Sequence, residues 1–592
     1  MFVNFKQTGK SALVLEMLKS MAPNDAYICG KHDFSRSKAY SALIEAIQIF
    51  CDNLLLKDEL EIKKYRSLIL GAIGEEGRLL TNIIDNLHLI IGEQSEVSDN
   101  FNHETKHKFN YVFINFIKAI ASVSNPLVLV LEDLQWLDIA SIDLLKALLK
   151  SQIKNLMFIG VYRDNDVCDA YQLAEFLKFV KEIDISPTNI TLENMDYEST
   201  NELISDALCV SPLESYSLTT FVQGRTKGNP FFVKHMLRSL FEKEKITFNH
   251  EKRKWQWDDC TNETKGIAEN VIGLLRLKIQ SFDMHTQQTL AVATCLGSRS
   301  SLSFLRKIMN NKEGDEGLKG VEGALSSGML THCKRNDTYF FAHDLVQHAA
   351  KSFLPKDPKP IYLHIARKLV KMFSEVELND NICLIAHLHY RAKDLIHDDE
   401  RLNIAELFEM AGEKEMIATA FDEAFKYFES GVALLGPDCW KVQYNLSVKL
   451  HCNAARAAYC MAKFENIKEY IEKLFANATR LTDVIPAYVT LVQFYCYKNN
   501  HKEAVTTAIG VLNKLGESIN LKHNDSLAEL EILKTKSLVG NSFQQVLNIE
   551  VIKDSKGIIR VMEFFSLILL SAYHVDIRLY IVISCEFEYF AQ

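Results

Sequence analysis

The chain has 592 residues, which is too long for one hydrophobic core and indicates three or four domains. Hydrophobic residues make up 48% of it and charged residues 24%, as in ordinary globular proteins, and its net charge of −9 disfavours a general polyanion binder. The thirteen cysteines form no C-x-x-C pair, which argues against a disulfide framework or zinc site and predicts reduced thiols in a cytosolic protein.

The first third of the chain alternates between helical and extended patterns. A helix is predicted at 12–21 ("ALVLEMLKSM"), and helical periodicity runs from 40 to 91, most clearly in "LLTNIIDNLHLII". Short apolar runs predict strands, namely "AYICG" (26–30), "PLVLVLED" (126–133), "NLMFIGVY" (155–162) and "NITLENM" (189–195). Strands that alternate with helices predict a parallel sheet that is covered on both faces.

The middle of the chain is predicted to be mostly helical, in keeping with only 24 glycines and 10 prolines. Helices are predicted over 199–242, and a mixed segment containing "WQWD" (255–258) follows. Over 271–354 the helices are joined by a hairpin in "GMLTHCKRNDTYFFAHD", a pattern typical of a winged helix.

Beyond Pro360 the sequence predicts helices alone. Similar amphipathic helices recur about every forty residues, with equivalent places held by Ala424, Ile467 and Ala504. Such spacing is typical of tetratricopeptide-like helical hairpins. The apolar run "VMEFFSLILLSAYHV" (561–575) is short for a membrane span and contains Glu563, so we expect a buried helix rather than a span.

The stretch "NFKQTGKS" (4–11) resembles a phosphate-binding loop. Gly9, Lys10 and Ser11 match the end of the pattern G-x-x-x-x-G-K-[ST], while Asn4 stands where the pattern has glycine. In such a loop, backbone N–H groups and a helix N-terminus surround an anion, the lysine reaches the β- and γ-phosphates, and the serine hydroxyl binds Mg²⁺. Alone, "GKS" is more often an ordinary surface turn.

Two acids end the apolar run at 127–131. Glu132 or Asp133 would hold the water shell of the metal, and the neighbouring acid could polarise an attacking water. The alternative is a solvated strand end or a helix cap. Because both motifs occur in the right order and beside the expected secondary structure, the sequence predicts a nucleotide site that takes ATP and Mg²⁺.

Several segments in order resemble one family. The segments "TGKSAL", "HDFSRSKAYSALIEA", "LVLEDLQWLDIAS", "GVYRDND", "KGNPFF", "WQWD" and "FAHDLVQHAA" are similar to the origin-recognition-complex-like AAA ATPase module of the STAND class of signalling NTPases, which occurs in multi-sensor kinases. The resemblance runs from Gly9 to about Gly516. It implies an α/β P-loop NTPase domain (1–198), a helical lid (199–270), a winged helix (271–355) and an all-α tetratricopeptide-like array (360–592).

By this resemblance Gly9, Lys10 and Ser11 match the Walker A residues, and Glu132 and Asp133 match the Walker B acids. Lys10 would stabilise charge on the phosphates, and Asp133 would orient water for hydrolysis. Ser11 and Glu132 would bind the metal ion or its water shell.

Three further residues have a family role and an ordinary alternative. Arg163 falls where the class places a nucleotide-sensing arginine, although a surface ion pair is equally open. Pro230 matches the proline of a G-x-P motif that packs near the nucleotide; otherwise it starts a helix. His343 is similar to a histidine that senses the diphosphate, or it is a structural histidine followed by a helix-capping Asp344.

The chain departs from the family pattern at its start. The family usually has glycine at the positions of Asn4 and Gln7, and only "MFV" precedes Asn4, so the strand that feeds the loop is expected to be clipped. Asparagine tolerates left-handed backbone angles, which makes Asn4 a mild defect. The chain also ends within a helical pattern, and we expect it to be a fragment truncated at both ends.

The sequence thus predicts an ATP-binding regulatory switch of a signalling protein, with slow hydrolysis if any. The alternative is a nucleotide-independent helical-repeat scaffold whose ATPase site has degenerated. DNA binding is disfavoured, because residues 271–354 hold ten Lys/Arg against seven Asp/Glu and no clustered basic stripe. The helical repeats would contact a protein partner, other domains of the parent chain or another copy.

Overall fold

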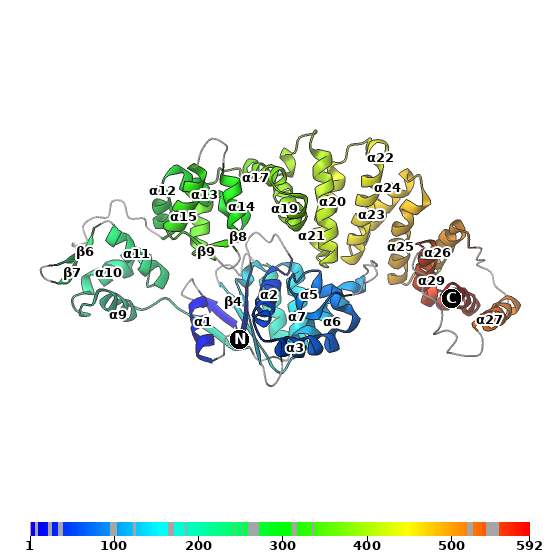
Figure 1. Ribbon diagram of the computed structural model, residues 1–592, viewed down its shortest axis with the longest axis horizontal. Helices are drawn as coiled ribbons and strands as arrows, with labels where there is room; N and C mark the ends of the chain where they lie inside the picture. The colour runs from blue at the N-terminus through cyan, green and yellow to red at the C-terminus, as the bar shows by residue number, and fades with distance from the viewer. Residues whose placement is uncertain are drawn as a thin grey trace. The chain divides into compact units, whose positions relative to one another are not determined.

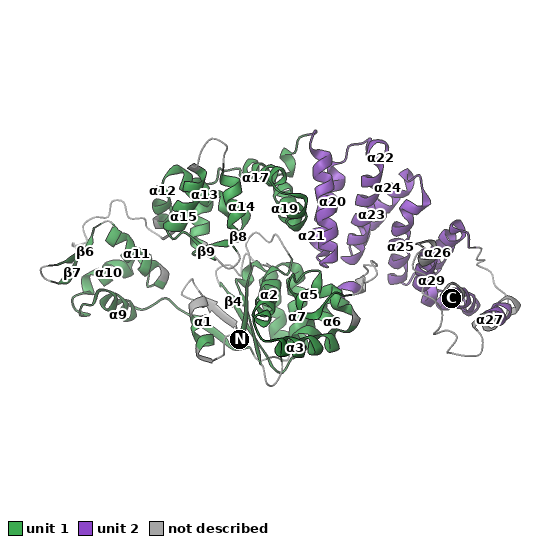
Figure 2. Cartoon of the chain, viewed as in Figure 1, with its two compact units in different colours: residues 1–98, 108–397 green, residues 99–107, 398–592 purple. Residues whose placement is uncertain are grey.

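The computed structural model of the chain divides into two compact units (Figure 2), residues 1–98 with 108–397 and residues 99–107 with 398–592. The described residues are 2–5, 10–21, 27–32, 39–94, 103–121, 126–163, 171–183, 185, 187–242, 244–250, 253–257, 271–310, 316–333, 337–517, 525–539 and 556–591.

A parallel sheet lies at the start of the first unit (Figure 1). Its strands are β1 (Phe2–Phe5), β2 (Tyr27–Lys31), β3 (Leu127–Glu132), β4 (Leu156–Tyr162) and β5 (Asn189–Leu192). Within the described residues the sheet has five strands in the order β2-β3-β4-β1-β5, and every neighbouring pair is parallel. The short β1 therefore lies inside the sheet, between β4 and β5.

Helices alternate with these strands. They are α1 (Lys10–Met21), α2 (Ser41–Leu55), α3 (Glu59–Ile73), α4 (Arg78–Thr81), α5 (Leu87–Ile91), α6 (His103–Ile120), α7 (Ile139–Lys150) and α8 (Tyr171–Glu182). Val14 and Leu18 of α1 pack against Val130 of β3. Leu129 of β3 faces the opposite side, because side chains alternate along a strand, and it is buried there. Both faces of the sheet are covered, as predicted.

Helices and a hairpin follow the sheet. They are α9 (Tyr197–Leu208), α10 (Tyr216–Thr226), α11 (Pro230–Glu242) and the antiparallel strands β6 (Ile246–Asn249) and β7 (Lys254–Trp257). Ile246 and the two tryptophans of β7 pack onto the apolar faces of the three helices. The "WQWD" motif thus supplies a strand whose indoles cover a small helical core.

The rest of the first unit combines helices with a three-stranded antiparallel sheet. Its elements are α12 (Val271–Gln280), α13 (Met284–Leu296), β8 (Arg299–Ser301), α14 (Leu302–Met309), α15 (Glu316–Ser326), β9 (Leu330–Cys333), β10 (Thr338–Phe341), α16 (Asp344–Lys351), α17 (Lys359–Met372), α18 (Glu375–Asp380) and α19 (Ile382–Arg391). β9 and β10 form the predicted hairpin, and β8 pairs with the other edge of β10.

The second unit is helical throughout its described residues beyond 398. Its helices are α20 (Arg401–Ile417), α21 (Phe421–Leu434), α22 (Cys439–Val442), α23 (Tyr444–Cys460), α24 (Phe464–Asn477), α25 (Leu481–Tyr497), α26 (His501–Leu515), α27 (Asp525–Val539), α29 (Lys556–Val575) and α30 (Ile577–Ala591). A parallel α/β domain followed by an almost entirely helical chain is the fold class that the sequence predicts, and it is confirmed.

The predicted repeat corresponds to successive helix pairs, α20 with α21, α23 with α24 and α25 with α26. Ala424, Ile467 and Ala504 are each the fourth residue of the second helix of a pair, and each is fully buried. The same place in each pair is therefore occupied by a side chain of the core, which explains the period in the sequence.

Gly412 permits close packing within the first of these pairs. A Cβ atom built on Gly412 in α20 would overlap the ring of Phe428 in α21, which is fully buried. We therefore expect Gly412→Ala to lower the free energy of unfolding of the array by roughly 1–3 kcal/mol, because the ring cannot move without disturbing the core.

Hydrogen exchange of the α20 and α21 amides measures this effect. Gly510→Ala is the matched control, since Gly510 is an exposed glycine of α26 with no atom within 4 Å of the added Cβ. That substitution should be neutral or stabilise by up to about 1 kcal/mol, as alanine favours a helix over glycine. Equal exchange in both variants would contradict the packing role of Gly412.

The apolar run at 561–575 lies within α29. Its buried residues Val561, Phe564, Phe565, Ile568 and Ala572 form one stripe that packs in the core of the second unit. Across the helices that the structure describes, none has both the length and the apolar character that a bilayer crossing requires.

Candidate functional site

The predicted phosphate loop connects β1 to α1. Lys10 is the first residue of α1 and Ser11 the second, whereas residues 6–9, including Gly9, lie outside the described residues. Asn4 lies in β1, where it is paired in register with Tyr162 of β4 and Thr191 of β5. The loop therefore runs from the carboxyl end of a strand inside the sheet to a helix N-terminus, the arrangement that suits an anion.

Asn4 has an extended backbone, because it pairs with strands on both sides. The expectation that Asn4 is a defect rests on a left-handed backbone at this position, and the strand pairing removes that reason. A residue in a strand does not need the additional backbone conformations that glycine permits, so glycine at this position would offer no advantage.

Lys10 reaches the end of β4. Its half-buried ammonium group donates a hydrogen bond to the carbonyl oxygen of Tyr162, at an Nζ–O distance of 3.3 Å. Tyr162 is the last residue of β4. The side chain of Lys10 thus lies along the carboxyl edge of the parallel sheet, which is the edge where α/β proteins bind ligands.

Asp133 lies at the same edge, directly after β3, and is almost fully buried. Gln135 Nε2 donates a hydrogen bond to its Oδ1 at 2.9 Å. Lys31 Nζ is 3.2 Å from Oδ2, and Arg163 Nη2 is 3.8 Å from Oδ1. Both carboxylate oxygens are therefore engaged by protein groups.

The pKa of Asp133 reflects two opposed effects. Burial opposes ionisation of the carboxyl group, but the positive charges of Lys31, Arg163 and Lys10, with the hydrogen bond from Gln135, outweigh it and lower the pKa below its usual value. Asp133 is consequently a carboxylate at neutral pH. Three cations therefore act on this one carboxylate.

Glu132 is the last residue of β3 and is partly exposed. It is paired in register with Lys31 of β2, and its carbonyl oxygen accepts a hydrogen bond from the backbone N–H of His32 at 3.1 Å. Asp133 follows the end of β3 with a left-handed backbone, so the strand alternation does not extend to it. Glu132 therefore places a second carboxylate at this edge, beside Asp133.

Arg163 follows the last residue of β4 and has a largely buried side chain. Its guanidinium carbon lies 5.4 Å from the ring centroid of Trp136. Lys10, Glu132, Asp133 and Arg163 thus lie at one edge of the sheet.

Pro230 and His343 belong to parts of the chain outside this sheet. Pro230 begins α11, after Gly228, whose φ of 74° is one that only glycine adopts readily. His343 precedes α16, and its Nδ1 accepts a hydrogen bond from the backbone N–H of Leu345 at 3.1 Å. The cap of α16 is therefore the histidine itself, and the expected capping role of Asp344 is corrected.

Sequence reasoning missed Lys31, Gln135 and Trp136. Gln135 and Trp136 lie within the quoted segment "LVLEDLQWLDIAS", and Lys31 is the residue that follows the predicted strand "AYICG". The carboxyl ends of parallel strands meet at one edge, so a polar residue after each buried run was the available signal.

The residues at this edge fit a metal-bound nucleotide. The cations of Lys10, Lys31 and Arg163 suit phosphate groups, and Glu132 offers a hard oxygen ligand of the kind that Mg²⁺ prefers. Within the described ranges no group of three or more His, Cys, Asp and Glu could hold a metal by itself. A site with only one or two carboxylates would suit Mg²⁺, because this ion is commonly held by one or two carboxylates together with phosphate oxygens.

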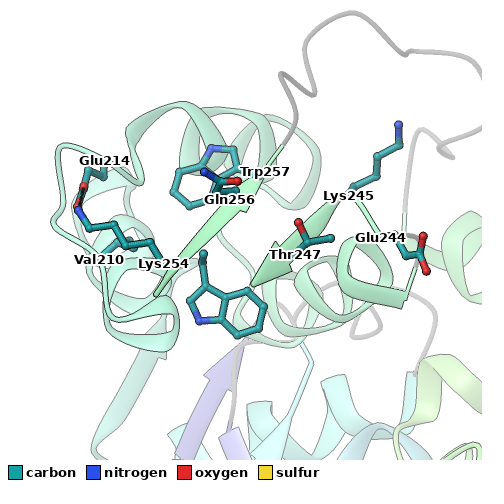
Figure 3. Close-up of a pocket in the computed structure, with 9 residues that line it drawn as sticks. Val210, Glu214, Glu244, Lys245, Thr247, Lys254, Gln256 and Trp257 are labelled. Carbon is teal, nitrogen blue, oxygen red and sulfur yellow. Dashed lines mark hydrogen bonds and ion pairs between the residues drawn. The ribbon is translucent and has the colours of Figure 1, made fainter. Parts of the chain in front are cut away.

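A cavity of about 470 Å³ opens elsewhere, beside the β6–β7 hairpin (Figure 3). Its lining includes Trp255 and Trp257, and the indole N–H of Trp257 donates to Ser217 Oγ at 3.1 Å. Lys254 Nζ is 2.9 Å from Glu214 Oε1, so these two charges of the wall neutralise each other.

Two family models match parts of the chain. Residues 6–159 match the AAA ATPase domain, and this range includes Lys10, β2, β3 and the acids Glu132 and Asp133. Residues 196–253 match a domain of unknown function (DUF8739), and this range includes most of the residues that line the cavity. The edge with Lys10 and Asp133 is therefore part of an AAA ATPase domain.

Two curated proteins are similar along most of the chain. "Hybrid signal transduction histidine kinase G" of Dictyostelium discoideum is 23% identical over 668 residues, covering 91% of this chain and 19% of that protein. "Peroxide stress-activated histidine kinase mak3" of Schizosaccharomyces pombe is 19% identical over 514 residues, covering 77% of this chain and 21% of that protein. The chain spans about a fifth of the length of these relatives.

One solved structure is similar over the whole chain. It is the crystal structure of a Signal Transduction ATPase with Numerous Domains (STAND) protein with a tetratricopeptide repeat sensor, from Pyrococcus horikoshii. The sequence identity is 13%, the TM-score is 0.40, and the match covers all of this chain and 82% of that one. Taken together, the chain carries an AAA ATPase domain and is similar to signalling histidine kinases over most of its length.

Proposed function

We propose that the chain is an ATP-binding switch of a signalling protein, with the nucleotide at the carboxyl edge of the parallel sheet. The observation that carries this proposal is the convergence of Lys10, Lys31 and Arg163 around Asp133. A cluster of cations at the carboxyl edge of a parallel sheet favours a polyanion such as a triphosphate.

In this proposal the residues have distinct tasks. Lys10 leaves the carbonyl of Tyr162 and contacts the phosphates, while Gly9 and the N-terminus of α1 offer backbone N–H groups. Ser11 and Glu132 bind Mg²⁺ or its water shell, and Asp133 orients a water if hydrolysis takes place. Lys31 and Arg163, which lie beside Asp133 without nucleotide, would contact the phosphates when ATP is bound.

The finer resemblance extends the proposal to the rest of the chain. We assign residues 1–198 to an origin-recognition-complex-like P-loop domain, 199–270 to its helical lid, 271–355 to a winged helix, and 360–592 to tetratricopeptide-like repeats in a cytosolic STAND-type module. Pro230 and His343 would then contact the nucleotide in one state of the switch. ATP shifts the chain between states only if it binds one of them more tightly.

A nucleotide-independent scaffold is the second candidate. The observation that favours it is the internal pairing of the site, since Lys10 already bonds to Tyr162 and Asp133 already pairs with Lys31. The helical repeats would then be the working surface, for a protein partner, for another part of the parent chain or for a second copy.

Equilibrium binding of a fluorescent ATP analogue with Mg²⁺ separates the two candidates. We expect the full chain to bind it and Lys10→Ala to weaken binding roughly tenfold to a hundredfold, because a charged hydrogen bond to phosphate is lost. Lys19→Ala is the matched control, since Lys19 is an exposed lysine of the same helix.

A second variant tests the loop. From the sequence alone, Asn4→Gly is expected to tighten binding by restoring a loop glycine, but the strand pairing of Asn4 leads us to expect a change within about twofold. A folded wild-type chain that binds no nucleotide would overturn the switch and leave the scaffold.

A further inference from the structure

We propose that Trp136 is a positioning residue for Arg163: its indole holds the guanidinium at the edge of the nucleotide site, so that Arg163 can distinguish a nucleoside triphosphate from a diphosphate. This inference rests on the proposed nucleotide site and adds to it a residue that governs which nucleotide is preferred.

The geometry places Arg163 between two partners. The guanidinium carbon is 5.4 Å from the centroid of the Trp136 ring, within the range of a cation–π contact, and Nη2 is 3.8 Å from Asp133 Oδ1. The arginine side chain is only 13% exposed. Little room is therefore left for Arg163 to point into solvent.

The chain fixes the position of Trp136 through a tight turn. Asp133 has a left-handed backbone, with φ 55° and ψ 48°, and a short 3₁₀ helix of residues Leu134–Trp136 follows. The backbone N–H of Trp136 donates to the carbonyl oxygen of Asp133 at 3.0 Å. Leu134 and Gln135 are buried. The turn that carries Asp133 therefore also carries the ring that faces Arg163.

The end of the turn is fixed as well. Asp138 caps α7, since its Oδ1 accepts a hydrogen bond from the backbone N–H of Ser141 at 2.8 Å. The N–H of Leu137 donates to the carbonyl oxygen of Leu134 at 3.2 Å. The backbone of Trp136 is thus held between a buried turn and the N-terminus of a helix.

The two partners of Arg163 have different electrostatic consequences. A close ion pair with Asp133 would neutralise the guanidinium and draw it away from a ligand. An indole face attracts the cation through its quadrupole but carries no net charge, so Arg163 keeps its full charge for a phosphate. Without the ring, Arg163 would move onto Asp133, and its contribution to binding the additional phosphate of a triphosphate would fall.

Equilibrium binding of MgATP and MgADP to the full chain tests this. The measured quantity is the ratio of the Kd for ADP to the Kd for ATP. We expect Trp136→Leu to lower this ratio roughly threefold to thirtyfold, the range for removal of a cation–π contact. Trp136→Phe, which keeps an aromatic face, should retain most of the ratio. If Trp136→Leu does not fold, Trp136→Met takes its place.

A double-mutant cycle with Arg163→Gln shows whether Trp136 acts through the arginine. Once Arg163→Gln has removed the guanidinium, Trp136→Leu should change the ratio no further. Equal weakening of ATP and ADP by Trp136→Leu, or an undiminished effect in the Arg163→Gln chain, would overturn the inference and leave the nucleotide site standing. Absence of nucleotide binding by the wild-type chain would overturn both.

Discussion

Replacement of Asp133 by asparagine should tighten the binding of MgATP about tenfold and slow any hydrolysis by a factor on the order of 100 or more. The two effects have one cause. Asp133 is a buried carboxylate whose pKa is lowered by Lys31, Arg163 and Lys10. When its charge is removed, these cations lose their counter-charge and attract phosphate more strongly, while the group that would orient water is lost.

Without nucleotide, Asp133→Asn should lower the stability of the folded chain. Loss of a buried carboxylate that lies among three cations removes favourable charge interactions from the folded state. The melting temperature should therefore fall for Asp133→Asn and recover with MgATP more than it does for the wild type. Titration calorimetry gives the affinity, phosphate release the turnover, and thermal unfolding with and without nucleotide the stability.

Glu132→Gln is the matched control, because it removes the neighbouring carboxylate from the same strand end. Glu132 is partly exposed and is proposed to serve Mg²⁺. We therefore expect this variant to weaken Mg²⁺-dependent binding rather than strengthen binding. If Asp133→Asn weakens ATP binding as Glu132→Gln does, the electrostatic account of the site is wrong.

The strands of the sheet could be predicted because each is a short apolar run. The apolar run before Glu132 forms β3, which is buried on both faces. Glu132 ends this strand and Asp133 follows it directly. The helical period at 79–91 was misleading, since the structure has two short helices, α4 and α5, with a turn between them. Asn86 Nδ2 donates to Asp52 Oδ1 at 2.6 Å, and Gln48 Nε2 donates to Asp85 Oδ2 at 3.2 Å. Such tertiary hydrogen bonds from α2 are invisible to periodicity.

The site could be predicted only where a motif carries it. Lys10 and Asp133 belong to recognisable patterns, whereas Lys31 reaches Asp133 only because β2 lies next to β3, and the order of strands cannot be read from apolar runs. Gln135 and Trp136 are oriented by the left-handed backbone of Asp133, which no periodicity reports. Similarly, the sequence favours Asp344 over His343 as a possible cap of α16, because aspartate is the commoner cap, but His343 takes that role.

The stability of the helical array should depend on the protonation of Glu409. This residue of α20 is 5% exposed, and Lys449 Nζ of α23 lies 3.4 Å from its Oε1. Burial raises the pKa of Glu409 to about 7, with a further contribution from the nearby carboxylate of Glu413, and Lys449 opposes part of the rise. The folded array therefore holds a proton that the unfolded chain releases near pH 4.5.

The sign of the pH dependence follows from this difference. Between about pH 4.5 and 7 the folded state binds more protons than the unfolded state, so the contribution of Glu409 to stability falls as the pH rises and is lost above pH 7. Glu409→Gln keeps a neutral side chain at every pH. We expect it to stabilise the array by up to about 3 kcal/mol at pH 8 and by almost nothing at pH 4.5.

Hydrogen exchange of the α20 and α23 amides at several pH values is the suitable measurement, because a chain with two compact units need not unfold in one step. Glu406→Gln, which removes the same charge from an exposed position of α20, should show no such pH-dependent gain. Glu413→Gln should weaken the pH dependence without abolishing it, since burial of Glu409 remains the larger cause. A difference between Glu409→Gln and wild type that stays constant from pH 4.5 to 8 would show that Glu409 is ionised throughout, with Lys449 outweighing its burial.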